Sequence, residues 1–498
     1  MNTVEPRSVS RLDHLPDPGS FGGGYGHKPS YTTDQAAKQL TRQNLRFHDR
    51  NGDSKIDVNY TVDTSFTQAQ QRRVRQAVQS WQDVANINFH EQPGGSDGTL
   101  NIRNNPSGNR GVATFPNRFT TSTSATIGTQ GESRSPALGS HFAVTAIHEI
   151  GHAIGLHHPG DYGRNFDYNK EAVYAEDTKA RTVMSYWSET KQKGHDFKRQ
   201  NPSAPMMDDI AAAQRLYGAN HQTRHTDTTY GFNSNTEREA LSLKSATDQP
   251  VFCVWDGGGV DTLDFSGFAQ DQHINLNAES FSDVGGLKGN VSIAQGCVIE
   301  NAIGGSGRDT LSGNEAANRL KGGGRGDTLK GGGGADTFVY DKASDSTPSD
   351  PDMIEDFTSG TDTIDVSGAM KEAGVPALVF TDRFTGRAGE VVLKQDASTG
   401  GSSLAIDLKG TGKADLLVQS KRAIKPADVR WNGQTPGTRP VPAPTPTPPA
   451  PAPLADKTRE DTAGLIQLLA ITLLGFFSQL LGLLTSPSGQ APAQKNQV

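Results

Sequence analysis

The sequence predicts an α+β domain followed by an all-β domain, and three observations support this order. Up to about residue 240, apolar residues recur at helical spacing in several segments, with short alternating runs between them. After about residue 240 the helical spacing ends and Gly-Asp pairs punctuate the chain. Within that second region glycine-rich nonapeptides repeat, which is typical of a parallel β-roll. We therefore predict an α+β domain over 31–240 and a parallel β-roll with a β-sandwich over 241–432.

Composition excludes several classes of protein. The 498 residues carry a net charge of −7, which argues against a basic nucleic-acid-binding surface, so we expect no nucleic-acid partner. Two cysteines, Cys253 and Cys297, are too few for a disulfide scaffold. We expect two buried free thiols, with a bond between them as the alternative. No apolar run of signal-peptide length occurs in the first forty residues, so classical signal-peptide export is not expected.

The first domain is expected to begin after a leader or propeptide over 1–30, which is rich in Gly, Pro and Ser. Thr32 with Gln35 predicts a capping box that opens a helix to about residue 45, and Thr67 with Gln70 predicts a second one. Apolar residues at helical spacing then give the second helix one buried face. Further helices are expected at about 142–154 and 206–216, and strands at about 56–62, 87–89, 100–102 and 112–115.

The strongest signal is the segment His148-Glu149-x-x-His152-x-x-Gly155-x-x-His158. A helix places His148 and His152 on one face, where both imidazoles can bind one metal ion. Gly155 tolerates the positive φ of a sharp turn, and that turn would return His158 as a third ligand. Three nitrogen ligands leave a position open for water, which is the arrangement of a catalytic zinc site. Glu149 would take the proton of that water.

The neighbouring His157 is the alternative third ligand, although the spacing favours His158. We expect one zinc ion. Incidental histidines on a helix would not produce five fixed positions at this spacing.

A second segment, Thr182-Val183-Met184-Ser185-Tyr186-Trp187, lies downstream. Together with the histidine segment and the Pro-Gly-Asp-Tyr that follows it, this sequence resembles the serralysin family of secreted bacterial metzincin proteases. The likeness extends to 33–37, 204–212 and 230–236, and so covers about 31–432.

The resemblance implies an α+β metzincin catalytic domain in which Met184 forms the Met-turn. It also implies that Tyr186 is a further zinc ligand, which moves away during turnover and helps to stabilise the oxyanion. In the family the substrate lies extended along an edge strand, and the matching segment here is about 111–116. Backbone pairing of that kind tolerates many sequences, so we expect endopeptidase activity on unfolded or loosely folded proteins.

The second domain contains calcium-binding nonapeptides of the form Gly-Gly-x-Gly-x-Asp-x-apolar-x with a period of nine. Because one coil of a β-roll takes two units, Asp309 would stack on Asp327, and Asn318 would stack on Asp336. Carboxylates and turn carbonyls that face each other supply the oxygen ligands calcium prefers, so we expect several calcium ions. The expected ligand groups are Gly304, Ser306, Asp309, Gly322, Gly324, Asp327, Gly331, Gly333, Asp336 and, in an outlying repeat, Asp261.

Two departures from the repeat predict weaker binding on one edge. Asn318 is a poorer ligand than Asp, and Arg325 is not expected to adopt a glycine conformation easily. After the roll, Asp352, Asp356 and Asp362 are either calcium ligands or turn caps. The inward-facing core is expected to be Leu311, Leu320, Leu329 and Phe338.

The last 66 residues differ from both domains. A proline-rich linker is expected over 433–453, followed by an apolar tail over 454–498. The stretch 463–485 carries no charge and is long enough to span a bilayer. It is interpreted either as an export signal or associating helix, or as a membrane anchor.

These patterns predict a secreted, calcium-stabilised zinc endopeptidase that acts on extracellular proteins. The family resemblance implies a zymogen exported by a one-step (type I) transporter, with calcium folding the roll only outside the cell. Membrane tethering through the tail is the alternative location. The alternative function is a calcium-binding surface or adhesion protein whose zinc site is only structural.

Overall fold

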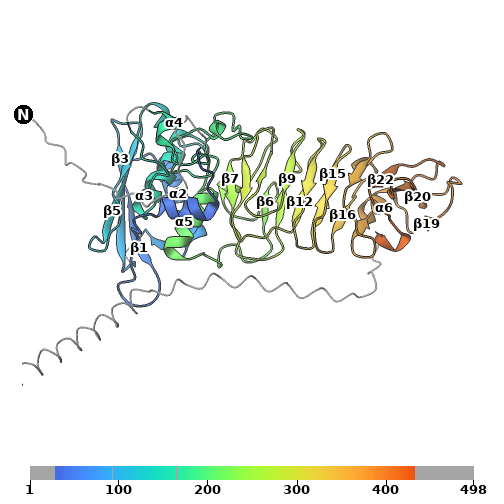
Figure 1. Cartoon of the computed structure of the whole chain (residues 1–498), viewed down its shortest axis with the longest axis horizontal. Coiled ribbons are helices and arrows are strands. Elements are labelled where there is room, and N and C mark those ends of the chain that lie inside the picture. Colours follow the sequence, from blue (N-terminus) through green and yellow to red (C-terminus); the bar gives the residue numbers. More distant parts are fainter. Residues whose placement is uncertain (1–27, 92–93, 164–165, 432–498) are drawn as a thin grey trace, which may run out of the picture. The chain divides into compact units, whose positions relative to one another are not determined.

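The computed structural model describes residues 28–91, 94–163 and 166–431. A region of mixed helices and strands is followed by a long β region built mostly of parallel strands, so the predicted fold class is confirmed (Figure 1). The expectations for the leader up to residue 27, the linker 433–453 and the tail 454–498 fall outside the described residues. Among the residues that are described, no helix has both the length and the apolar composition that a bilayer span requires.

The mixed region is built on a five-stranded sheet with the order β2-β1-β3-β5-β4. Neighbouring strands are parallel except for β4, which runs antiparallel to β5 and forms one edge. The strands are β1 (Asp57–Val62), β2 (Asn88–His90), β3 (Gly98–Asn105), β4 (Gly111–Ala113) and β5 (Ser122–Gly128). The helices are α1 (Thr33–Leu40), α2 (Gln68–Val84), α3 (His141–Ala153), α4 (Tyr168–Glu171) and α5 (Met207–Tyr217).

Both predicted capping boxes are present. The Thr32 side chain accepts from the Gln35 N–H at the start of α1, and Thr67 accepts from Gln70 at the start of α2. α1 ends at Leu40 rather than near residue 45, and a turn follows it. The predicted apolar face of α2 is buried, and its Trp81 donates an indole hydrogen bond of 3.0 Å to the Ile147 carbonyl of α3. This contact attaches α2 to the helix that carries the histidines.

The β region contains short strands in successive turns of the chain. They form a three-stranded sheet (β10-β11-β7), a seven-stranded sheet (β23-β18-β16-β14-β12-β8-β6) and an eight-stranded sheet (β19-β20-β21-β22-β17-β15-β13-β9). Only β10–β11 and the long strands β20, β21 and β22 pair antiparallel among the named strands of this region. The strands are β6 (Thr229–Gly231), β7 (Phe252–Val254), β8 (Thr262–Asp264), β9 (His273–Asn275), β10 (Phe281–Ser282), β11 (Val291–Ile293), β12 (Asn301–Ile303), β13 (Thr310–Ser312), β14 (Arg319–Lys321), β15 (Thr328–Lys330), β16 (Thr337–Val339), β17 (Asp352–Ile354), β18 (Thr363–Asp365), β19 (Val379–Phe380), β20 (Glu390–Gln395), β21 (Ser402–Asp407), β22 (Leu416–Ser420) and β23 (Val429–Arg430), with helix α6 (Ser367–Ala373) between β18 and β19.

The β-roll has the register that the repeat predicts. Leu311 pairs with Leu329 in neighbouring strands, and Leu320 pairs with Phe338, so one coil takes two nonapeptides. All four of these side chains are fully buried, as predicted. Arg325 does adopt the left-handed conformation that glycine normally occupies, with φ +72°, so its presence does not break the turn. The turn imposes this conformation at a cost of about 1–2 kcal/mol.

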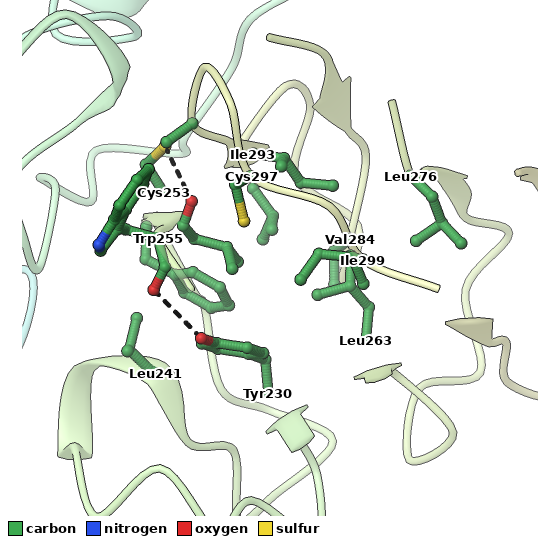
Figure 2. Close-up of a cluster of buried hydrophobic side chains, with 14 of the residues drawn as sticks. Tyr230, Leu241, Cys253, Trp255, Leu263, Leu276, Val284, Ile293, Cys297 and Ile299 are labelled. Carbon is green, nitrogen blue, oxygen red and sulfur yellow. Dashed lines mark hydrogen bonds between the residues drawn. The ribbon is translucent and has the colours of Figure 1, made fainter. Parts of the chain in front are cut away.

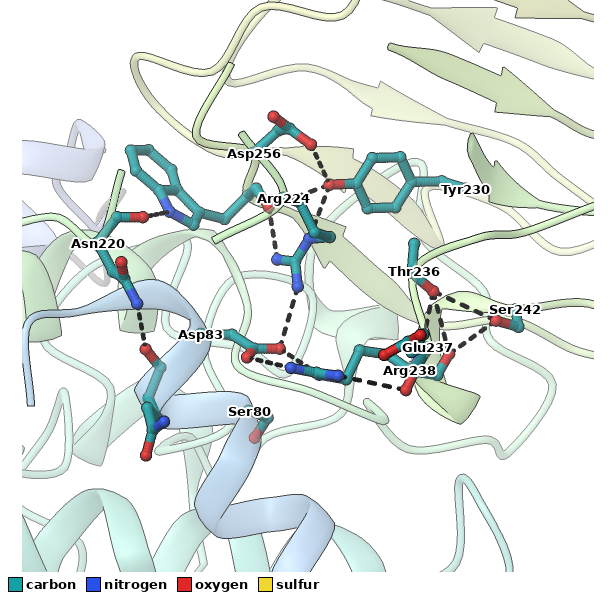
Figure 3. Close-up of polar contacts among 12 residues, drawn as sticks. Ser80, Asp83, Asn220, Arg224, Tyr230, Thr236, Glu237, Arg238, Ser242 and Asp256 are labelled. Carbon is teal, nitrogen blue, oxygen red and sulfur yellow. Dashed lines mark hydrogen bonds and ion pairs between the residues drawn. The ribbon is translucent and has the colours of Figure 1, made fainter. Parts of the chain in front are cut away.

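A polar cluster joins α2 to the segment that leads into the roll (Figure 3). Asp83, near the end of α2, accepts hydrogen bonds from Arg224 at 3.0 Å and from Arg238 at 2.8 and 2.9 Å. Arg224 also donates to the Tyr230 hydroxyl at 2.9 Å, and Tyr230 in turn donates to Asp256 at 2.7 Å. The carboxylate is therefore shared by two guanidinium groups at the junction of the two regions.

Beside this junction, Cys253 and Cys297 lie in an apolar cluster with Leu263, Ile293 and Ile299 (Figure 2). Both thiols are buried and free, so the favoured prediction for the cysteines is confirmed.

Candidate zinc centre and calcium-binding turns

The helix α3 places two histidines in the interior of the protein. It begins after Ser140, whose side chain caps the Ala143 N–H, and twelve of its thirteen residues are buried. Its apolar side chains pack against α2 and β5, so His148 and His152 are held on a rigid element. Two polar rings in such a surrounding require partners, because an unpaired buried polar group is costly.

The chain leaves α3 through Gly155, as predicted. This residue lies at φ +113°, and a Cβ atom there would stand 1.8 Å from the Leu45 carbonyl oxygen. Only glycine therefore fits this turn. The returning backbone is fixed by a 2.7 Å hydrogen bond from the His157 N–H to the Leu40 carbonyl and by Arg42, which donates to the His158 carbonyl at 2.8 Å.

The turn brings His158 to the two helical histidines. Its Nε2 lies 3.1 Å from Nε2 of His148 and 3.0 Å from Nε2 of His152. The opposite ring nitrogens are committed elsewhere: Nδ1 of His148 contacts the Val183 carbonyl at 2.8 Å, and Nδ1 of His152 contacts the Leu156 carbonyl at 2.7 Å. Because a carbonyl only accepts, each Nδ1 carries the proton and each Nε2 presents its lone pair.

The electrostatics favour neutral imidazoles at this site. Burial is the main cause that lowers the pKa of His148 to about 3 and that of His152 to about 4, and neighbouring histidines add to both effects. Burial likewise lowers the pKa of His158 well below its usual value. Three converging neutral nitrogens, two of them on rings that a backbone carbonyl orients, form the donor set that zinc prefers. The residues present therefore fit a zinc ion.

His157 lies outside this group. Its ring stacks on Phe115 with a centroid distance of 4.4 Å, and its buried Nε2 has no hydrogen-bond partner among the described residues. The two adjacent histidines therefore have different places: His158 belongs to the histidine cluster, and His157 packs against Phe115.

Met184 packs against the helix that carries two of the histidines. It is fully buried, and a Cβ atom on Gly151 of α3 would lie 2.7 Å from its sulfur, so the side chain of Met184 lies directly against the backbone of α3. The turn is held by Asp209 of α5, which accepts from the Thr182 hydroxyl at 2.5 Å and from the Val183 N–H at 2.7 Å. The same Val183 orients His148, so this turn positions one ring of the cluster.

Glu149 follows His148 on α3 and points toward the edge strand. A Cβ atom on Gly111, the first residue of β4, would lie only 2.2 Å from its carboxylate oxygen. The absence of a side chain at Gly111 therefore makes room for the carboxylate. Burial raises the pKa of Glu149 to about 8.

Tyr186 lies beside two of the three histidines. Its ring centroid is 5.7 Å from that of His148 and 4.6 Å from that of His158, and the residue is 46 % exposed. Behind it stands Tyr162 at 4.7 Å, whose hydroxyl donates to the buried Asp177 at 2.6 Å. Asp177 also accepts from Ser185 at 2.7 Å and so ties both aromatic residues to the Met184 turn.

Comparison with known proteins agrees with this geometry. Residues 33–212 match a family model described as Metallo-peptidase family M12B Reprolysin-like, and residues 219–429 match Peptidase M10 serralysin C terminal. The metallopeptidase AprA of Pseudomonas marginalis is 48 % identical over 82 % of this chain and 93 % of its own length. Serralysin G of Dickeya chrysanthemi is 42 % identical over 82 % of this chain and 92 % of its own.

The chain belongs to the serralysin family. It is therefore a zinc metalloendopeptidase with a three-histidine zinc site at His148, His152 and His158. The metalloprotease AprA of Pseudomonas entomophila is a further relative, 46 % identical over 82 % of this chain and 92 % of its own length.

The serralysin C-terminal region places the predicted calcium residues in stacked turns. The Asp309 N–H donates to Asp327 at 2.7 Å, and the Asn318 N–H donates to Asp336 at 2.8 Å, so each pair meets across one coil. The glycines and Ser306 form the turns above these carboxylates; for example, Gly304 donates to the Lys321 carbonyl at 2.8 Å and Ser306 to the Phe268 carbonyl at 3.0 Å. The remaining turn residues of the set are Gly322, Gly324, Gly331 and Gly333.

Several of these carboxylates are buried beside other acids. One oxygen of Asp327 has no hydrogen-bond partner among the described residues, whereas Asp261 faces the Asp256 carboxyl group and Asp352 faces the Tyr340 hydroxyl. Burial and the Asp352 charge raise the pKa of Asp327 to about 9, and burial together with Asp256 raises that of Asp261 to about 8. An orphaned oxygen among crowded acids fits a hard divalent cation. Asp356 instead caps the Gly331 and Gly332 amides at 2.9 Å.

Proposed function

We propose that this protein hydrolyses peptide bonds of extracellular proteins with Glu149 as the general base. The observation that supports this is that Glu149 directly follows His148, one of three converging histidines, and that its carboxylate reaches Gly111 of the edge strand β4. His148, His152 and His158 would hold the zinc ion. When bound, zinc supplies Lewis-acid polarisation of the scissile carbonyl and lowers the pKa of the attacking water.

Glu149 then performs two proton transfers in sequence. Its carboxylate accepts a proton from the attacking water and delivers that proton to the leaving amine nitrogen as the C–N bond breaks. The carboxylic acid that forms in the first transfer is the proton donor in the second, so these two steps need no further acid or base.

Tyr186 is proposed as a further zinc ligand and as a donor to the oxyanion. Its ring lies against two of the three histidines, so its hydroxyl is on an exposed side chain beside the reacting centre. A hydroxyl that donates to the developing oxyanion stabilises the transition state more than the substrate.

The substrate is proposed to lie extended along β4. Within the part of the chain that the structure describes, this strand pairs only with β5, which leaves its outer edge available, and Val112 at its centre is 64 % exposed. A peptide that adds to such an edge is held by main-chain hydrogen bonds and need not have one sequence. Unfolded or loosely folded proteins can present a segment of this kind.

Calcium is proposed to stabilise the roll through the stacked turns around Asp309, Asp327 and Asp336, with Asp261 in an outlying turn. Without ions the facing carboxylates repel each other, and a glycine-rich chain loses much entropy on folding. A chain that folds only where calcium is abundant suits export in an unfolded state by a one-step transporter. Secretion, a propeptide within 1–30 and membrane contact through 463–485 stay predictions.

Casein hydrolysis by the full chain tests this function. We expect a zinc chelator in excess calcium to stop hydrolysis and one equivalent of zinc to restore it. Hydrolysis that continues without zinc would contradict the proposal. The adhesion alternative predicts no hydrolysis at all and binding to a surface that persists after zinc removal.

The pH dependence of the ion-free roll is a further prediction. The folded-state pKa values of Asp327, about 9, and Asp336, about 7, lie above the usual Asp value near 4. The folded roll therefore binds protons more tightly than the unfolded chain. Its stability is highest below pH 4 and falls as the pH rises from about 4 to about 7 for the Asp336 contribution and to about 9 for that of Asp327.

Hydrogen exchange measures this effect locally. In a calcium chelator we expect amides of 310–340 to be protected at pH 5 and to lose protection by pH 9, after correction for intrinsic rates. Millimolar calcium should keep them protected at both pH values. Equal protection at pH 5 and 9 without calcium would exclude this role of the buried carboxylates.

A further inference from the structure

A cavity opens beside Tyr186, which is one of its lining residues. It has a volume of about 510 Å³, and its lining includes Lys179, Tyr186, Ser188, Glu189, Lys198 and Asn201. Because Tyr186 contacts the histidine cluster, this cavity adjoins the proposed reacting centre. The inference drawn from it rests on the proposed function.

Lys179 lines the cavity, and its ammonium group has fewer hydrogen-bond acceptors than donors. Its Nζ makes one hydrogen bond among the described residues, of 3.0 Å, to the Asn201 side-chain oxygen. That oxygen is aimed at Lys179 because the Asn201 amide nitrogen donates to the Gly139 carbonyl at 3.0 Å. An ammonium group has three donors, so two of them are left for a ligand.

Glu189 and Glu132 attract this charge only from beyond ion-pair distance. Glu189 accepts from the Phe197 N–H at 3.1 Å and from the Ser188 hydroxyl at 2.9 Å, and among the described residues no carboxylate lies within 4.0 Å of the Lys179 ammonium group. Asp196 caps the Lys198 N–H at 2.9 Å. Burial lowers the pKa of Lys179, as expected for a cation that lacks a direct anionic partner.

We propose that Lys179 makes this cavity a subsite for an acidic side chain of the substrate, next to the bond that is cleaved. A glutamate or aspartate carboxylate would accept hydrogen bonds from the two remaining donors of Lys179 and would place a negative charge next to its ammonium group. Hydrogen bonds between two charged groups are stronger than neutral ones. The preference equals the difference in binding free energy between a substrate with a carboxylate at this position and one with the neutral amide of the same shape.

Cleavage-site profiling tests the proposal first with the unaltered protein. The zinc- and calcium-loaded full chain is incubated with a library of proteome-derived peptides, and the products are sequenced by mass spectrometry. We expect Asp and Glu to be enriched at one position that flanks the cleaved bond. Cleavage without any acidic enrichment would overturn the inference, whereas no cleavage of any peptide would contradict the proposed function instead.

Matched variants then assign the preference to one residue. With paired peptides that carry Glu or Gln at the enriched position, Lys179→Met should lower kcat/KM for the Glu peptide about tenfold and leave the Gln peptide within about twofold. Lys179→Arg keeps the charge and should keep the preference. Lys193→Met removes the same charge from an exposed position outside the cavity lining and should leave the Glu/Gln ratio unchanged. An unchanged ratio in Lys179→Met, or an equal loss in Lys193→Met, would reject Lys179 as the determinant.

Discussion

Replacing Glu149 with Gln is expected to lower kcat for peptide hydrolysis by about 10²–10⁴-fold, because an amide cannot accept the proton of the attacking water. The substitution preserves the side-chain volume. Glu149 is not one of the three residues that hold the zinc ion, so the zinc content should stay at one per chain. Hydrolysis of a fluorogenic peptide and zinc analysis of the same sample measure both quantities. Glu372→Gln, on the exposed surface of α6, is the matched control and should leave hydrolysis unchanged.

A companion variant moves the carboxylate without removing it. In Gly111→Ala the new methyl group would occupy space 2.2 Å from the Glu149 oxygen, so the carboxylate must shift while the residue stays ionisable. A displacement of about 1 Å at a reacting group can cost about 100-fold in rate. Full activity in Glu149→Gln would refute the general-base role. Full activity in Gly111→Ala alone would show that the carboxylate has room to move and still react.

The zinc site could be predicted from the sequence because its ligands are local. His148, His152 and His158 lie within eleven residues, so helix geometry and one glycine turn are enough to bring them together. The β-roll was predictable for a similar reason, since its register follows directly from the nine-residue period. Arg325 shows the limit of this reasoning, because the neighbouring coils force it into a conformation that its own preference disfavours.

The residues that hold the site in place could not be predicted. Asp209 fixes the turn around Met184 from α5, and Asp177 fixes Tyr162, yet neither has a local pattern that distinguishes it from a surface acid. Their partners lie 15 to 27 residues away in the sequence. Asp83 is a stronger case: it contacts Arg224 and Arg238, which are 141 and 155 residues downstream. Such contacts depend on tertiary packing, which sequence spacing does not encode.

Replacing Asp83 with Ala is expected to lower the free energy of unfolding by about 3–5 kcal/mol. This is the usual cost of removing one partner of a buried ion pair, because the other partner is left buried and unpaired. The Asp83 and Arg224 side chains are only 10 % and 9 % exposed, and Arg238 is 26 % exposed. Without the carboxylate, two guanidinium groups would face each other at the junction between α2 and the segment that leads into the roll. Arg224 would keep its 2.6 Å bond to the Trp255 carbonyl, which does not neutralise its charge.

Urea unfolding at fixed zinc and calcium concentrations measures this loss, with Arg75→Ala as the control. Arg75 forms an exposed pair with Glu91, whose removal should cost no more than about 1 kcal/mol. The double variant Asp83→Ala/Arg238→Met separates repulsion from lost attraction: if the excess positive charge is responsible, the second substitution should recover part of the loss. A loss below about 1 kcal/mol in Asp83→Ala would mean that water replaces the carboxylate and that the two regions are held together mainly by apolar packing around Trp255.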